Sequence, residues 1–286
     1  MKILIGCGDY STISGVPMFV HTLAVELHAR GHHVRVVAPN VNGVMAAKTR
    51  EAGVHVSTFD GVRGNHYDVV HANGIHTCNW ASHQQGLRVI ATVHSTLVYE
   101  TPFLHDSIRH YVAVRPQIRE KIIAVDGVQK SRATVIFNGV DRTRFASNLE
   151  KFDTPTVAFV GTVDYLREQA SRLAMRDAAE RGWNILFLGR KLSGHLDDLP
   201  DNASYQEGDV WDIENVIGRC VATAGILLGR TTIEGWWAGL PGFIYEIDND
   251  GRVVSSGLHD PPAPQIMEMF DARFMADRYE ELYERV

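Results

Sequence analysis

The chain has 286 residues, a length that accommodates two domains of about 100–200 residues each. Its formal net charge of −6 argues against a protein that holds nucleic acid through a broadly basic surface. The three cysteines, Cys7, Cys78 and Cys220, are widely spaced, so we expect a cytoplasmic protein with buried thiols and without disulfides or a zinc site. No run approaches about 18 apolar residues, so we also expect no transmembrane segment.

Short apolar runs alternate with segments of helical period along the first half of the chain. The predicted strands are 2–6, 34–38, 69–72, 89–93, 111–114 and 134–137, and the clearest predicted helices are 15–30 and 116–125. This alternation is typical of parallel βαβ units in which helices cover both faces of the sheet.

A second series follows a polar segment at 141–155. Its predicted strands are 157–161, 184–189, 203–205, 223–228 and 242–245, and its predicted helices are 165–181, 213–220 and 232–238. We therefore expect an α/β protein with two Rossmann-like doubly wound domains, 1–146 and 147–268, that face a central cleft. An amphipathic C-terminal helix, 269–286, is expected to pack back across both domains.

The segment from Arg230 to Pro241 lies between two apolar runs and predicts a tight turn followed by a short helix. Thr231 precedes Glu234 by three residues, which is the spacing of a capping box. A helix N-terminus presents unpaired N–H groups and the positive end of the helix dipole, so it suits a phosphate. The alternative is a capped core helix that binds nothing.

Three other signals limit the chemistry. Gly6-x-Gly8 lacks the third glycine of a dinucleotide fingerprint, and the histidines show no metal-binding spacing, so we expect no metal site. Asn138-Gly139 is a turn signal that does not by itself indicate a function. His94 follows a predicted buried strand, where a histidine serves a structural or a functional role.

Several ordered segments carry a family resemblance. They are Ser14-Gly15 at a helix start, LHARGHHV at 27–34, YDVVH at 67–71, ATVH at 91–94, TVIFNGVD at 134–141, FVG at 159–161 and IEGWWAGLP at 233–241. In this order and spacing the chain resembles the family 4 glycosyltransferases, which are retaining enzymes of the GT-B fold. By this resemblance 1–146 is the acceptor domain and 147–268 is the nucleotide-sugar domain.

The resemblance implies a role for each matching position. His94 and Arg167 are implied at the reacting centre, and Ser14 and Gly15 at the acceptor. The implied donor-binding residues are Gly161, Arg167, Arg190, Arg230, Thr231, Thr232 and Glu234, with Glu234 on the ribose and the arginines on the diphosphate. A surface role is the alternative for each arginine. Three family positions differ, because Thr162 replaces an arginine, Arg167 replaces a lysine and Ile226 replaces the first of two paired glutamates.

The implied activity is transfer of a hexose or pentose from a nucleotide-diphosphate sugar, with retention of anomeric configuration, without a metal and without a further cofactor. The acceptor is a small molecule, a protein or a modified nucleic acid. Two other functions stay open: a nucleotide-sugar epimerase or hydrolase of the GT-B type, and a non-catalytic protein that binds nucleotide sugars.

Overall fold

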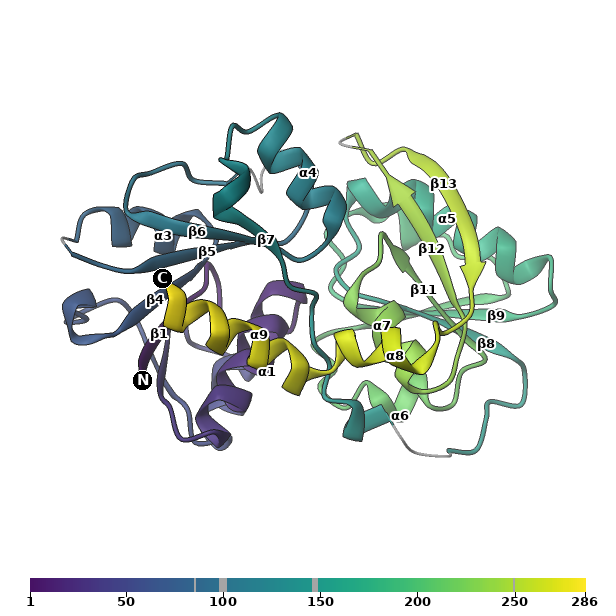
Figure 1. Ribbon diagram of the computed structural model, residues 1–286. Helices are drawn as coiled ribbons and strands as arrows, with labels where there is room; N and C mark the ends of the chain where they lie inside the picture. Colours follow the sequence, from purple (N-terminus) through teal and green to yellow (C-terminus); the bar gives the residue numbers. More distant parts are fainter. Residues whose placement is uncertain (85, 98–101, 146–148, 249) are drawn as a thin grey trace. The chain divides into compact units, whose positions relative to one another are not determined.

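The computed structural model describes residues 1–84, 86–97, 102–145, 149–248 and 250–286, and these form two compact α/β units (Figure 1). The N-terminal unit comprises residues 1–139 and 269–286, and the C-terminal unit comprises residues 140–268. The expected boundary at 146/147 falls on residues 146–148, which lie outside the described residues. The predicted doubly wound fold is confirmed in both units.

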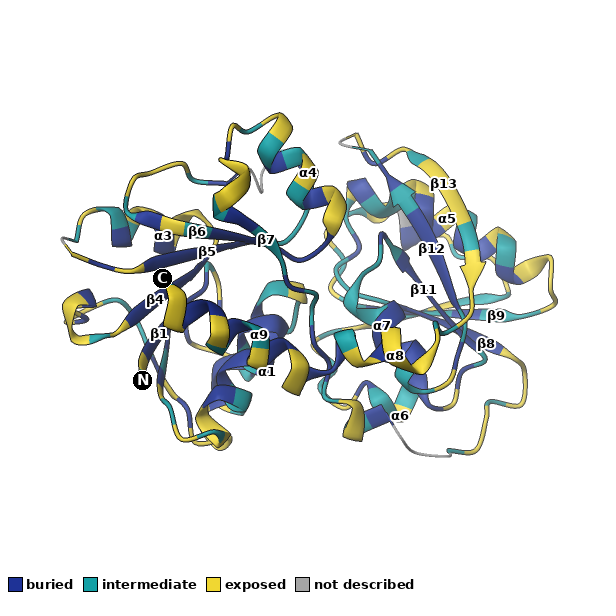
Figure 2. Cartoon of the chain, in the orientation of Figure 1, coloured by how far each residue is buried: buried dark blue, intermediate teal, exposed yellow. Residues whose placement is uncertain are grey.

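The N-terminal unit is built on a sheet of seven parallel strands in the order β3-β2-β1-β4-β5-β6-β7. Every residue of β4 and β5 is buried (Figure 2), which explains why both sequences, VVHAN and VIATV, are mostly apolar. The strands are β1 (Lys2–Gly6), β2 (His33–Val37), β3 (His55–Ser57), β4 (Val69–Asn73), β5 (Val89–Val93), β6 (Ile108–Ala113) and β7 (Ala133–Val135).

The helices of this unit are α1 (Gly15–Ala29), α2 (Val44–Glu51), α3 (Ile75–Ser82), α4 (Pro116–Ala124) and α9 (Ala272–Arg285). α1 and α4 match the sequence prediction closely. α2, α3 and the strand β3 were not predicted, because each has eight residues or fewer and few apolar positions. Among the described residues, no helix is both long and apolar enough to span a bilayer.

The C-terminal unit contains a six-stranded sheet in the order β10-β9-β8-β11-β12-β13. The first five strands in this order are parallel, and β13 pairs antiparallel with β12 at the edge. The elements are β8 (Thr156–Val160), α5 (Glu168–Ala179), β9 (Asn184–Gly189), β10 (Ala203–Glu207), α6 (Glu214–Ile217), β11 (Ala222–Ile226), α7 (Arg230–Trp237), β12 (Gly242–Ile247), β13 (Val253–His259) and α8 (Pro264–Met267).

The C-terminal helix α9 completes the N-terminal unit. It packs against α1 and buries Met275, Tyr279 and Tyr283. Its start rests on the Asn138-Gly139 turn, where a Cβ atom on Gly139 would lie 2.7 Å from the Cα atom of Ala272. The turn therefore does more than reverse the chain, because only glycine leaves room for α9 there.

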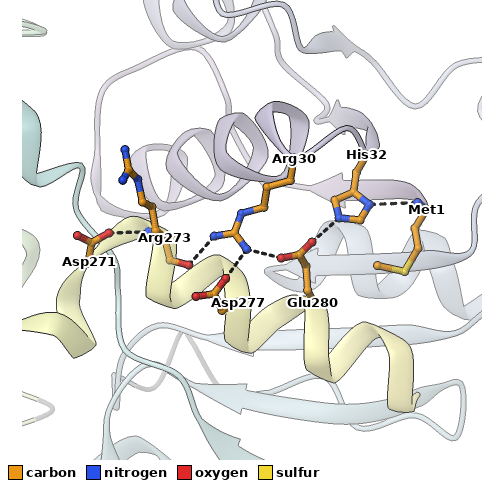
Figure 3. Close-up of polar contacts among 7 residues, drawn as sticks. All are labelled: Met1, Arg30, His32, Asp271, Arg273, Asp277 and Glu280. Carbon is orange, nitrogen blue, oxygen red and sulfur yellow. Dashed lines mark hydrogen bonds and ion pairs between the residues drawn. The ribbon is translucent and has the colours of Figure 1, made fainter.

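Ion pairs join α9 to the loop between α1 and β2 (Figure 3). The Arg30 guanidinium donates to Asp277 at 2.5 Å, and it also contacts Glu280. The Met1 ammonium group lies 3.0 Å from His32 Nδ1, so Nδ1 accepts and Nε2 donates to Glu280 at 2.5 Å. We call Arg30, His32, Asp277 and Glu280 the α9 clasp.

Candidate functional site

The strand order of the C-terminal unit locates its candidate site. β8 has β9 on one side and β11 on the other, so the direction of winding reverses between β8 and β11. In open α/β sheets, ligands bind outside the carboxyl ends of the strands at such a switch point. Three loops meet this criterion, and they follow β8, β9 and β11.

The loops after β8 and β9 touch through their backbones. Gly161 and Gly189 have φ angles of +135° and +138°, which side chains rarely adopt. A Cβ atom on Gly189 would lie 2.2 Å from the carbonyl oxygen of Gly161. The Gly161 N–H donates to the Leu188 carbonyl at 2.9 Å, and the Val163 N–H donates to the Arg190 carbonyl at 2.8 Å. Gly161 therefore contributes to the shape of the carboxyl edge of the sheet, and its N–H group is hydrogen-bonded within the sheet.

Arg167 and Arg190 both lie on these loops. Arg167 ends a short 3-10 helix, Tyr165–Arg167, and its guanidinium pairs with the Asp164 carboxylate. Asp164 also accepts from the Arg167 backbone N–H at 3.2 Å, so one carboxylate fixes both the backbone and the side chain. Arg190 is exposed directly after β9. Both cations are thus placed at the carboxyl edge of the sheet.

The third loop leads into α7, whose N-cap lies two residues before the predicted N-cap Thr231. Gly229 is the N-cap, and Leu227 has a φ angle of +56°, the only positive value among the described residues other than glycine. The capping-box prediction is wrong, because the Thr231 hydroxyl donates to the Val160 carbonyl at 3.2 Å. That bond ties the first turn of α7 to the end of β8.

Thr232 and Ile233 contribute less than the sequence suggested. The Thr232 side chain is fully buried, and a Cβ atom on Gly242 would lie 2.8 Å from its Cγ2 atom, so it packs between α7 and β12. The Ile233 N–H points to the Gly229 carbonyl at 3.4 Å, within the helix. Of these two residues, only Thr232 therefore has a backbone N–H placed to face a phosphate at the helix start.

Glu234 is 4% exposed and lies in the same helix as its partner Arg230. Arg230 Nε donates to Glu234 Oε1 at 2.7 Å. Burial raises the pKa of Glu234, and the nearby Arg230 and Arg144 guanidinium groups oppose that shift. A ribose that binds Glu234 must therefore share the carboxylate with Arg230 or displace it. Ile226, where a second glutamate was expected, is half-buried at the end of β11.

The N-terminal unit has a switch point of its own, between β1 and β4. Ser14 is the N-cap of α1 and makes no capping bond through its side chain. Gly15 is exposed, and no atom lies within 4 Å of the position that a Cβ atom would occupy. The fold itself therefore does not require glycine at this position.

His94 follows β5 in the N-terminal unit. Its Nε2 atom lies 3.0 Å from Asn73 Oδ1, and the edge of the Phe19 ring packs against it with centroids 4.8 Å apart. Burial lowers the pKa of His94 to about 3, so the imidazole is neutral near pH 7. The sequence analysis missed Asn73, although a polar residue at the end of an otherwise apolar strand was a usable signal.

His71, in β4, is fully buried. Its Nδ1 and Nε2 atoms each lie 2.7 Å from a hydroxyl oxygen, of Tyr283 and Thr92 respectively. The Thr92 hydroxyl also meets the Tyr279 hydroxyl at 3.0 Å. This network joins β4 and β5 to α9. Within the described ranges, no group of three His, Cys, Asp or Glu residues could hold a metal ion.

Comparisons with known proteins concern the family and the fold. Residues 13–144 match the family model described as Glycosyltransferase Family 4. No protein with a curated function matches the sequence.

Solved structures share the fold across both units. HepE of Anabaena, in complex with UDP and glucose, is 13% identical, with 100% of both chains covered and a TM-score of 0.75. A glycosyltransferase of Rickettsia africae is 13% identical, with 99% of this chain and 98% of that chain covered and a TM-score of 0.66. WaaG, a glycosyltransferase involved in lipopolysaccharide biosynthesis, is 12% identical, with 96% of this chain and 95% of that chain covered and a TM-score of 0.61. Residues 13–144 are therefore similar to glycosyltransferase family 4, and the chain has the GT-B fold of these solved structures.

Proposed function

We propose that the protein transfers a sugar from a nucleotide-diphosphate sugar to a hydroxyl-bearing acceptor, with retention of anomeric configuration and without a metal ion. The observation that carries the proposal is the hydrogen bond from Thr231 to Val160, which joins the start of α7 to the end of β8. It gathers a helix N-terminus, Arg167 and Arg230 at the switch point of one sheet, where an anionic ligand is favoured.

In this proposal the diphosphate lies against Arg167, Arg190 and Arg230 and against the backbone N–H groups of Thr231 and Thr232. Arginine suits the role because its planar donors match phosphate oxygens in pairs. Glu234 accepts hydrogen bonds from the ribose hydroxyl groups. Arg230 then bridges the two ends of the nucleotide, since it already contacts Glu234.

The proposed reaction uses these groups to stabilise the leaving group. The acceptor oxygen bonds to the anomeric carbon as the bond from that carbon to the diphosphate oxygen breaks. The acceptor proton passes to the departing diphosphate on the same face of the sugar, so configuration is retained. Fixed cations and helix N–H groups stabilise the charge that develops on the diphosphate, and the remaining rate gain comes from positioning. By the family resemblance, His94 serves the sugar and Ser14-Gly15 serve the acceptor.

UDP is the nucleotide probe for testing this proposal, because HepE binds UDP and glucose. Glu234→Gln keeps the shape of the side chain and removes its charge. We expect UDP affinity measured by calorimetry to fall about 10- to 100-fold, the usual worth of a hydrogen bond to a charged group. The matched control is Glu180→Gln, because Glu180 also pairs with an arginine four residues away, and its side chain is 62% exposed at the C-cap of α5. Equal affinities for the two variants would remove the assigned role of Glu234.

The replacement of a paired glutamate by Ile226 favours testing for a second function. A nucleotide-sugar epimerase or hydrolase turns over UDP-glucose without an acceptor, and a binding protein turns over nothing. Incubation with UDP-glucose alone, followed by NMR of the sugar, separates these functions from a transferase. Transfer that persists in EDTA, with a product of the donor's anomeric configuration, supports the proposed chemistry. Loss of transfer in EDTA contradicts it.

A further inference from the structure

Asn73 bridges the switch point of the N-terminal unit. It is the last residue of β4 and is 1% exposed. Its Nδ2 atom donates to the Gly6 carbonyl, at the end of the adjacent strand β1, at 3.2 Å. Its Oδ1 atom lies 3.0 Å from Nε2 of His94, at the end of β5. One amide thus joins the ends of three strands.

The Gly6 carbonyl sets the orientation of that amide. The peptide unit between Gly6 and Cys7 is fixed, because the Cys7 N–H donates to the Val37 carbonyl at 2.9 Å. α3 packs directly over Gly6, where a Cβ atom would lie 2.1 Å from the Thr77 side chain. A carbonyl oxygen only accepts, so the NH₂ end of the Asn73 amide must face it. The oxygen end must then face His94.

The ring protonation of His94 follows from that orientation. An amide oxygen only accepts, so Nε2 of His94 must carry the proton that it donates. A second proton on the ring would create a charge among Phe19, the buried His71 and the strand backbone, and burial disfavours that charge. The neutral imidazole then has its lone pair on Nδ1.

We propose that Asn73 is a positioning residue that holds His94 as the neutral Nε2–H tautomer, so that Nδ1 accepts a hydrogen bond from a hydroxyl group of the bound sugar. In this tautomer Nδ1 cannot donate to a phosphate oxygen, which leaves leaving-group stabilisation to the C-terminal unit. The hydrogen bond from a sugar hydroxyl to Nδ1 rests on the proposed function, whereas the tautomer of His94 does not.

The test is NMR of the ¹⁵N-labelled protein without any ligand at pH 7, with His94 assigned through bonds. We expect a protonated Nε2 and an unprotonated Nδ1. The reverse tautomer, a mixture of the two or an imidazolium overturns the inference. Because no ligand is present, this result is separate from nucleotide-sugar binding, and a failure of UDP to bind would remove only the sugar contact.

Two variants test whether Asn73 determines the tautomer of His94. Once ionised, the carboxylate of Asn73→Asp cannot donate to the Gly6 carbonyl and attracts a proton, so both His94 ring nitrogens should become protonated as the pH rises through the pKa of that carboxyl. If that variant does not fold, Asn73→Ala should let the Nε2 proton exchange with water at least about tenfold faster, because its acceptor is gone. The control is Asn202→Ala, since Asn202 also donates to backbone carbonyls, of Met175 and Trp183, but in the other unit. Unchanged His94 signals in the folded Asn73 variant would overturn the inference.

Discussion

Substitution of Gly189 tests the geometry that shapes the candidate nucleotide site. In Gly189→Ala the residue keeps a φ angle near +138°, which costs about 1–3 kcal/mol for a side chain. The added Cβ atom also lies 2.2 Å from the Gly161 carbonyl oxygen, a backbone atom that no rotamer change can move. Overpacking of this kind adds about 1–3 kcal/mol. We therefore expect the free energy of unfolding to fall by about 2–6 kcal/mol.

Gly208→Ala is the matched control. Gly208 follows β10 with a φ angle of +121°, and no atom lies within 4 Å of its Cβ position. It therefore carries the backbone strain without the overlap, and we expect a loss of about 1–3 kcal/mol. The effect of alanine on the unfolded chain is common to both variants and cancels in the comparison.

Urea unfolding followed by tryptophan fluorescence measures the difference between the two variants. The signal comes mainly from the C-terminal unit, which contains Trp183, Trp211, Trp236 and Trp237. UDP affinity should fall further in Gly189→Ala than in Gly208→Ala, because the overlap displaces Gly161. Variants whose stabilities agree within about 0.5 kcal/mol would refute the close approach of the two loops.

Three further predictions concern the N-terminal unit and the cysteines. Thr92→Val should cost about 2 kcal/mol in urea unfolding, because the buried His71 and Tyr279 each lose a partner; a loss below about 0.5 kcal/mol would contradict the network. Burial alone would raise the pKa of Glu280, but hydrogen bonds from the α9 clasp hold it below the ordinary value of 4.5. The stabilisation that ionised Glu280 provides is therefore present above pH 4.5 and lost as the pH falls. Glu280→Gln should lower the free energy of unfolding by about 1 kcal/mol at pH 7 and by less near pH 3. A loss that does not change with pH would contradict this. Burial raises the pKa of all three cysteine thiols to about 12, so iodoacetamide should label them only as the protein unfolds, as mass spectrometry can check.

The strands that run through the two cores could be predicted from the sequence because burial on both faces gives them continuous apolar runs. β1, β5 and β9 have the predicted bounds. The edge strand β13 was missed because it has no regular alternation of apolar and polar residues: Val254 and Leu258 are exposed together with Ser255-Ser256. Its pairing with β12 is a tertiary fact that no local pattern carries.

The candidate site was predictable in type and less so in detail. Resemblance led to Arg167 and Glu234, and both lie in the unit assigned to the nucleotide sugar. The capping box failed because the Thr231 hydroxyl has a partner 71 residues away, in the Val160 carbonyl. Asn73 was missed for the same reason, since its two partners come from β1 and from the residue after β5. Local spacing does not encode such contacts.

The inclusion of α9 in the N-terminal unit affects how the protein is made. The first 139 residues leave the ribosome without the helix that covers His71 and packs on Gly139. At about 5–20 residues per second, the ribosome needs roughly 7–30 s to proceed from Gly139 to the end of α9. The C-terminal unit is contiguous in sequence and complete before α9 is synthesised. The N-terminal unit can therefore complete its fold only after the whole C-terminal unit has been synthesised.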